Sequence, residues 1–206
     1  TTSSTITFTV NGANDAPTAS NNTVTTNEDT TYTFTASDFG FSDVDGDTLS
    51  SVTVSALSGS DGTFLLNGVA ITGSTSVTKT QIDSGLLTFV PDSNENGSSY
   101  NTFTFTVNDG TTDSASSYTM TVNVTAVNDA PTASNNTVTT NEDTDHTFAA
   151  SEFGFTDVDG DSLDHVSIET LPSNGTLLLS GSAVSAGDQI SAANISNLVF
   201  RPAANA

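Results

Sequence analysis

Hydrophobic and polar residues alternate in short segments along most of the chain. In residues 5–10 and 102–107, an apolar side chain stands at every second position and threonines fill the positions between. Alternation of this kind is typical of a strand with one buried face. No long segment shows a helical period, and single helical turns are expected at most near residues 37–40 and 80–84.

Several such segments follow one another, separated by turn residues. Asn67-Gly68 predicts a two-residue hairpin, because this turn needs positive φ at both central positions. Many short strands with turns between them predict an all-β fold built from β-sandwiches. The expected strands contain Val24, Tyr32 and Phe34, Val52 and Val54, Phe64 and Leu66, Val69 and Ile71, Leu87 and Phe89, Phe103 to Val107, and Tyr118 to Val124.

The whole pattern repeats. Residues 14–30 recur unchanged as residues 128–144, so the period is 114 residues, which is the size of a domain rather than of a solenoid unit. We therefore predict the last strand of a preceding repeat in residues 1–12, a complete repeat in 13–127, and a second repeat in 128–206 that lacks counterparts of the last two strands. Because residues 1–10 align with the final strand only, complete strand donation between identical chains is not expected.

Composition narrows the possible partners. Twenty-four acidic residues stand against Lys79 and Arg201, for a net charge of -22. This charge opposes binding to nucleic acid or to an anionic membrane surface and favours cations. The chain has no cysteine, which excludes disulfides and thiolate metal sites, and it has no apolar run long enough to insert into a membrane.

The acidic residues gather in turns. Asp43, Asp45 and Asp47 alternate around Gly46, and further acidic turns occur at residues 28–29 and at 109. Asp, Asn and Gly also favour turns for backbone reasons alone, but three acidic turns in one repeat favour a cation, and oxygen ligands suit Ca²⁺. The loop is not an EF-hand, because its twelfth position is Val54 where a bidentate Glu would be required.

Two groups of segments carry a family resemblance. Residues 105–110 and 118–131 look like the closing strands and the junction of a cadherin repeat, and residues 36–38 with 43–47 resemble the cadherin Asp-x-Asp turn. The chain is most similar to the bacterial cadherin-like tandem repeats of large, type I-secreted (RTX) surface and biofilm adhesins. The resemblance implies tandem cadherin/Ig-like Greek-key sandwiches with calcium-bound junctions, located outside the cell at the bacterial surface.

The resemblance also implies the Ca²⁺ ligands, and it places them at opposite ends of a repeat. The linker at residues 125–129 lacks the first carboxylate of the cadherin pattern, so fewer than three ions per junction are expected. A cluster bridging the two repeats would use Glu28, Asp29, Asp92, Glu95, Asn128, Asp129, Asp157, Asp159 and Asp161. A matching half-site at the other end of the first repeat would use Asn14, Asp15, Asp43, Asp45, Asp47 and Asp109.

No motif indicates an enzyme. His146 and His165 have no companions at metal-ligand spacing, and no Gly-x-Ser-x-Gly elbow occurs. We expect a non-enzymatic extender whose partners are the adjacent repeats of the same chain and which supports cell adhesion or biofilm formation. The alternative is that the repeats themselves bind a glycan or another adhesin chain, although the absence of Trp leaves little for a stacking platform.

Overall fold

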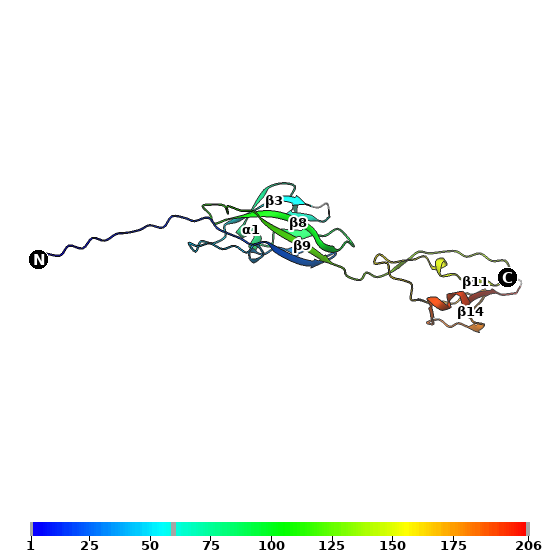
Figure 1. Cartoon of the computed structure of the whole chain (residues 1–206). Coiled ribbons are helices and arrows are strands. Elements are labelled where there is room, and N and C mark those ends of the chain that lie inside the picture. The colour runs from blue at the N-terminus through cyan, green and yellow to red at the C-terminus, as the bar shows by residue number, and fades with distance from the viewer. Residues whose placement is uncertain (1, 59–60, 205–206) are drawn as a thin grey trace. The chain divides into compact units, whose positions relative to one another are not determined.

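The computed structural model describes residues 2–58 and 61–204 and confirms the predicted all-β fold. The chain divides into two compact units, Thr1–Val127 and Asn128–Ala206. Strands dominate both units, and the helical elements are single turns or little more (Figure 1).

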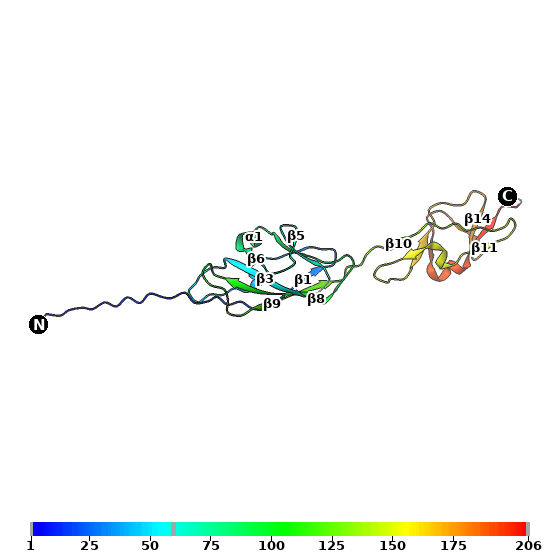
Figure 2. The same cartoon turned by 90° about the horizontal axis from the view of Figure 1, so that it is seen from above.

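Unit 1 is a sandwich of two sheets, seen from a second direction in Figure 2. The first sheet has the order β1-β9-β8-β3-β6, and only its β1–β9 pair is parallel. The second has the order β2-β7-β4-β5. The strands of the first sheet are β1 (Asn22–Asn27), β9 (Tyr118–Thr125), β8 (Gly97–Asn108), β3 (Ser51–Ser58) and β6 (Thr75–Thr78). Those of the second are β2 (Tyr32–Thr33), β7 (Leu87–Val90), β4 (Thr63–Leu66) and β5 (Val69–Ala70).

Phenylalanine rings fill the space between these sheets. Phe103 of β8 meets Phe34 and Phe64 edge to face, with centroid distances of 5.7 and 5.0 Å. Phe105 meets Phe39 in the same way at 5.1 Å. These residues are fully buried or nearly so, because the alternation in β8 turns every second side chain inward. The threonines between them face outward.

The short helical and turn elements of unit 1 follow local sequence signals. The single turns expected near residues 37–40 and 80–84 are confirmed as η1 (Ala36–Phe39) and α1 (Lys79–Asp83). Thr78 caps α1 by accepting a hydrogen bond from the Gln81 amide at 3.2 Å. The hairpin between β4 and β5 turns at Asn67 and Gly68, which have φ of 50° and 76°, as predicted.

Unit 2 retains one complete sheet and part of the other. Its four-stranded sheet, β11-β17-β14-β15, has the same order as β2-β7-β4-β5 of unit 1. The pair β13-β16 corresponds to β3-β6, and β10-β12 forms a short ladder near the start of the unit. The elements are β10 (Thr132–Ala133), β11 (His146–Thr147), η2 (Ala150–Phe153), β12 (Phe155–Thr156), β13 (His165–Ser167), β14 (Gly175–Leu179), β15 (Ser182–Ala183), β16 (Gln189–Ser191), η3 (Ala192–Asn197) and β17 (Leu198–Pro202).

Three sequence-based expectations need correction. Residues 5–10 form no strand, because no strand among the described residues pairs with them. The second strand is only two residues long, since the chain turns into η1 soon after Thr33. Strand β6 was missed because Val77 is its one apolar residue, too little to show alternation.

Candidate metal centre

An acidic loop after η1 lies at one end of unit 1 and is organised by the carboxylate of Asp43. Its Oδ1 accepts hydrogen bonds from the backbone amides of Asp45 at 2.8 Å and Asp47 at 3.2 Å. Its Oδ2 is buried and has no hydrogen-bond partner among the described residues. A buried carboxylate oxygen left unpaired is costly, so this atom marks a position where a cation would fit.

Two further segments converge on this loop. The backbone amide of Asp15 donates to Asp45 Oδ2 at 2.7 Å. The side-chain amide of Asn14 donates to Asp109 Oδ2 at 3.0 Å. Hydrogen bonds from the Thr112 amide and from the Asn14 side chain lower the pKa of Asp109 below its usual value. The structure thus gathers Asn14, Asp15, Asp43, Asp45, Asp47 and Asp109 at one end of unit 1.

Unit 2 builds the same loop from the repeated sequence. Asp157 Oδ1 accepts from the amides of Asp159 at 3.0 Å and Asp161 at 3.1 Å. The amide of Asp129 donates to Asp159 Oδ2 at 2.7 Å, as Asp15 does to Asp45. The Asn128 side chain donates to the Asp129 carbonyl at 2.9 Å, matching Asn14 and Asp15 at 3.0 Å. Two occurrences of one geometry show that it is a property of the repeat.

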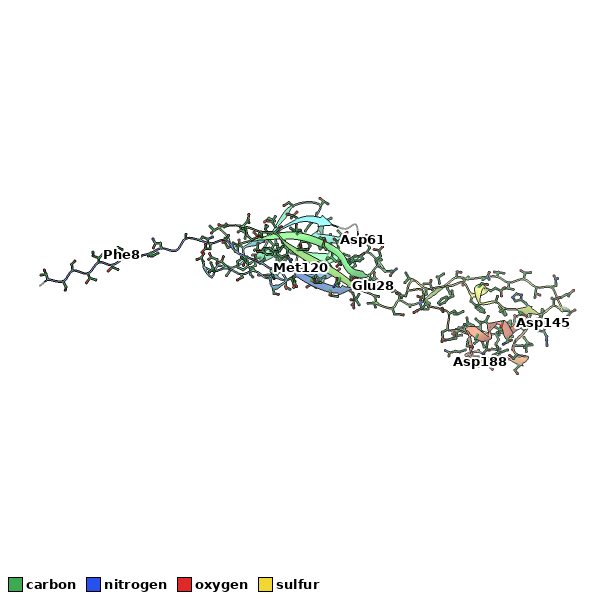
Figure 3. The ribbon with its side chains drawn as sticks, viewed as in Figure 1. Phe8, Glu28, Asp61, Met120, Asp145 and Asp188 are labelled. Atoms are coloured by element: carbon green, nitrogen blue, oxygen red, sulfur yellow. The ribbon has the colours of Figure 1, made fainter. Side chains whose placement is uncertain are left out.

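The opposite end of unit 1 carries a second acidic group, and Figure 3 shows Glu28 and Asp61 there. Glu28 is only 3% exposed, and its Oε1 accepts a hydrogen bond from the Val127 amide. The side chain of Asn96 donates to Glu28 Oε2 at 3.4 Å. In the same region the amide of Asn94 donates to Asp29 Oδ1 at 3.3 Å. The loop from Asp92 to Asn96 is therefore held beside the turn at residues 28–29.

Asp61 joins this second group and was missed from the sequence. One carboxylate oxygen each of Asp61, Asp92 and Glu95 lies within 4.8 Å of the others. The Tyr100 hydroxyl donates a hydrogen bond to Glu95 Oε2 at 2.9 Å. Burial, with the hydrogen bond to Glu95, raises the Tyr100 pKa to about 12. Asp61-Gly62 reads as an ordinary turn, so only the pairing of β4 with β7 places it near Asp92.

The donor sets consist of carboxylate, amide and backbone oxygens. Such hard oxygen donors suit Ca²⁺ rather than Zn²⁺ or copper, which favour imidazole or thiolate ligands. His146 is half-buried and lies 3.2 Å from Glu152 Oε2, and His165 contacts only Asp164 among the ion pairs found in the described residues. Neither histidine lies within the acidic loops.

Among the described residues, no helix is long and apolar enough to pass through a bilayer. No curated protein and no solved structure matches the chain significantly. A family model described as a bacterial Ig domain matches residues 14–125 and again residues 128–205. These two matches take in nearly all of both units. The chain therefore belongs to the bacterial Ig domain family and contains two of its tandem domains.

Proposed function

We propose that this chain is a non-enzymatic extender segment of a bacterial surface adhesin of the cadherin-like RTX type. Ca²⁺ bound at the ends of the repeats stiffens the array. The stiffened array supports cell adhesion or biofilm formation. Bacterial Ig-like domains are typically non-enzymatic repeats of surface proteins. The cadherin-like turn and junction segments of the sequence support the more specific adhesin role.

One observation carries the calcium hypothesis. Asp43 Oδ2 is buried and finds no hydrogen-bond partner in the part of the chain that the structure describes, whereas Oδ1 of the same carboxylate is held by two backbone amides. The amides fix the direction of the carboxylate, so the free oxygen is presented in one orientation. A cation there would satisfy the orphaned oxygen and offset the repulsion among Asp15, Asp45 and Asp109.

The chain's own residues would therefore hold ions at both ends of a repeat. At one end the ligands would come from Asn14, Asp15, Asp43, Asp45 and Asp109, and at the other from Glu28, Asp29, Asp92 and Glu95, joined by Asp61. Bound Ca²⁺ supplies positive charge and joins loops that otherwise repel one another. Extracellular modules bind Ca²⁺ with dissociation constants of about 10⁻⁴ to 10⁻³ M, so the ions would be taken up only after export.

The junction between repeats is where such ions would act on the array. Asn128 and Asp129 follow the last strand of unit 1 within a few residues and also belong to the acidic loop of unit 2. We propose that Ca²⁺ bound at this junction restricts the orientations of neighbouring repeats. Without the ion, like charges would repel and the linker would sample many orientations.

Calorimetric titration of Ca²⁺ into chelator-stripped protein tests the binding. Asp43→Asn is the informative variant, because the asparagine carbonyl can still accept the two loop amides while the charge is lost. We expect affinity at that site to fall by about tenfold or more, since ligand charge sets Ca²⁺ affinity. Asp83→Asn is the matched control: it removes the same charge at an exposed site that contacts Lys79 and should leave binding unchanged.

X-ray scattering of the stripped and Ca²⁺-loaded protein tests the stiffening. We expect a narrower distribution of shapes with Ca²⁺, and Asp157→Asn with Asp159→Asn should abolish that change. Binding without any change in scattering would remove the stiffening role and leave a Ca²⁺-stabilised domain. An absence of binding would refute the calcium hypothesis and leave an Ig-like spacer with acidic turns.

A further inference from the structure

The first and the last strand of unit 1 lie side by side. β1 pairs in parallel with β9 over six successive residue pairs, from Asn22 opposite Met120 to Asn27 opposite Thr125. β1 forms the edge of the first sheet, so β9 is its only strand neighbour among the described residues. A single ladder thus joins the segment where the chain enters unit 1 to the segment where it leaves.

Two side chains extend this ladder beyond its backbone hydrogen bonds. Before the first residue pair, the amide of Thr119 donates to Asn21 Oδ1 at 2.8 Å. After the last pair, the amide of Glu28 donates to the Thr125 carbonyl at 2.9 Å, and Glu28 Oε1 accepts from the Val127 amide. Alternate residues of a parallel strand face the partner strand, and Thr119, Thr125 and Val127 share one such alternation. The Asn21 and Glu28 side chains therefore act as further rungs at the two ends.

The rung made by Glu28 is enclosed by the protein. Glu28 is 3% exposed, and the two inward-facing residues of β1, Val24 and Thr26, are 6 and 8% exposed. The Asn96 side chain donates to Glu28 Oε2 at 3.4 Å. Hydrogen bonds to a charged acceptor are stronger than neutral ones, and shielding from water strengthens them further. Glu28 therefore holds the backbone at Val127 firmly to the end of β1.

Tension along the chain would load this ladder lengthwise. The segment before β1 is held at one end of unit 1, where the Asp15 amide donates to Asp45, and the segment after β9 lies beside Glu28 at the opposite end. Because β1 and β9 run in the same direction, such a pull acts on the start of β1 and on the end of β9. The strands are then drawn past each other, and their hydrogen bonds share the load. A pull on two adjacent strand ends would instead break these bonds in succession.

We propose that the β1–β9 ladder is the force-bearing clamp of unit 1 and that Glu28 locks it at the end where the chain leaves the domain. The proposal rests on the extender role proposed above, because an extender between attached surfaces transmits tension. The hydrogen bonds of the clamp are made by the chain alone. The clamp therefore gives Glu28 a mechanical role that does not depend on Ca²⁺.

Single-molecule force measurements on the full chain in chelator test the clamp. The chain has no native cysteine, so handles can be attached at chosen exposed positions. Gly12→Cys with Ala130→Cys loads the ladder lengthwise, whereas Gly12→Cys with Ser117→Cys pulls both strands from the same end and peels them apart. Forced unfolding is governed by the unfolding rate, and many bonds that break together resist more than bonds that break singly. We therefore expect an unfolding force about twofold higher or more in the lengthwise geometry.

Two variants test the role of Glu28. Glu28→Ala removes the acceptor of the Val127 amide, and Glu28→Gln keeps an oxygen at that place. In the lengthwise geometry, Glu28→Ala should unfold about tenfold faster at a fixed force, which is the factor that one hydrogen bond to a charged group supplies. Glu28→Gln should recover most of this loss. In the peeling geometry the end at Asn21 opens first, so Glu28→Ala should change the rate far less.

The comparison of geometries separates a clamp from ordinary stability. A residue that only stabilised the fold would change the unfolding rate equally in both geometries. Equal unfolding forces in the two geometries, or an equal effect of Glu28→Ala in both, would overturn the proposal. The comparison of forces needs no substitution of Glu28, so it decides the question even if Glu28→Ala fails to fold. Because chelator is present throughout, failure of the clamp would leave the calcium hypothesis standing, and absence of Ca²⁺ binding would leave the clamp standing.

Discussion

Phe39 and Phe153 occupy the same position in the two repeats but differ in packing, so replacing each by alanine measures what the first sheet, which contains β8, contributes to the packing at this position. Phe39 is fully buried and meets Phe105 at 5.1 Å and Phe34 at 6.2 Å. Phe153 is only partly buried, and among the described residues its ring meets one other ring, that of Phe148, at 5.8 Å.

The expected costs follow from burial. Removing a fully buried phenylalanine side chain costs about 3 to 5 kcal/mol of unfolding free energy, because transfer and cavity terms add. Phe39→Ala should therefore lower the urea midpoint of unit 1 by about 2 M for a slope of about 2 kcal/mol/M. Phe153→Ala should cost unit 2 only about 1 to 2 kcal/mol, since this side chain is already partly exposed to water.

The chain offers a separate signal for each unit. All three tyrosines lie in unit 1 and both histidines lie in unit 2. Tyrosine fluorescence therefore follows the unfolding of unit 1, and histidine proton resonances follow unit 2. If Phe153→Ala destabilised unit 2 as strongly as Phe39→Ala destabilises unit 1, Phe153 would be fully covered in solution and the comparison of the two repeats would be wrong.

Two further predictions use the same signals. Gly62→Ala should lower the unfolding free energy of unit 1 by about 2 to 4 kcal/mol, because the φ of Gly62 is +73° and a Cβ there would lie 2.4 Å from the Phe89 ring. Gly68 is the control: it also has positive φ, but an added Cβ would meet no atom within 4 Å. Gly68→Ala should therefore lower the unfolding free energy by only about 1 kcal/mol. Hydrogen bonds from Arg201 lower the pKa of Asp145, so its contribution to unit 2 is present above the unfolded pKa and is lost as pH falls from about 5 to about 3. Arg201→Gln should flatten that acid dependence in the histidine signals, and an unchanged slope would contradict the assignment.

Period and alternation were sufficient to predict much of the fold. The side chains alternate regularly in residues 101–108 of β8 and 119–124 of β9, and the turn at Asn67-Gly68 has a conformational requirement that few residues meet, so these parts of the fold were predicted correctly. Residues 5–10 alternate just as well and yet form no strand. Alternation shows which side chains a strand would bury, whereas the strand itself forms only when a neighbouring strand is present to pair with it.

The acidic loops were predictable in part for the same reason. Asp43, Asp45 and Asp47 are close in sequence, so a turn brings their backbone and side chains together by local geometry alone. Asp61 and Asp92 are 31 positions apart and approach each other only through the register of β4 on β7. The sequence around either residue does not determine how β4 pairs with β7, so the proximity of Asp61 to Asp92 is seen only in the folded sheet.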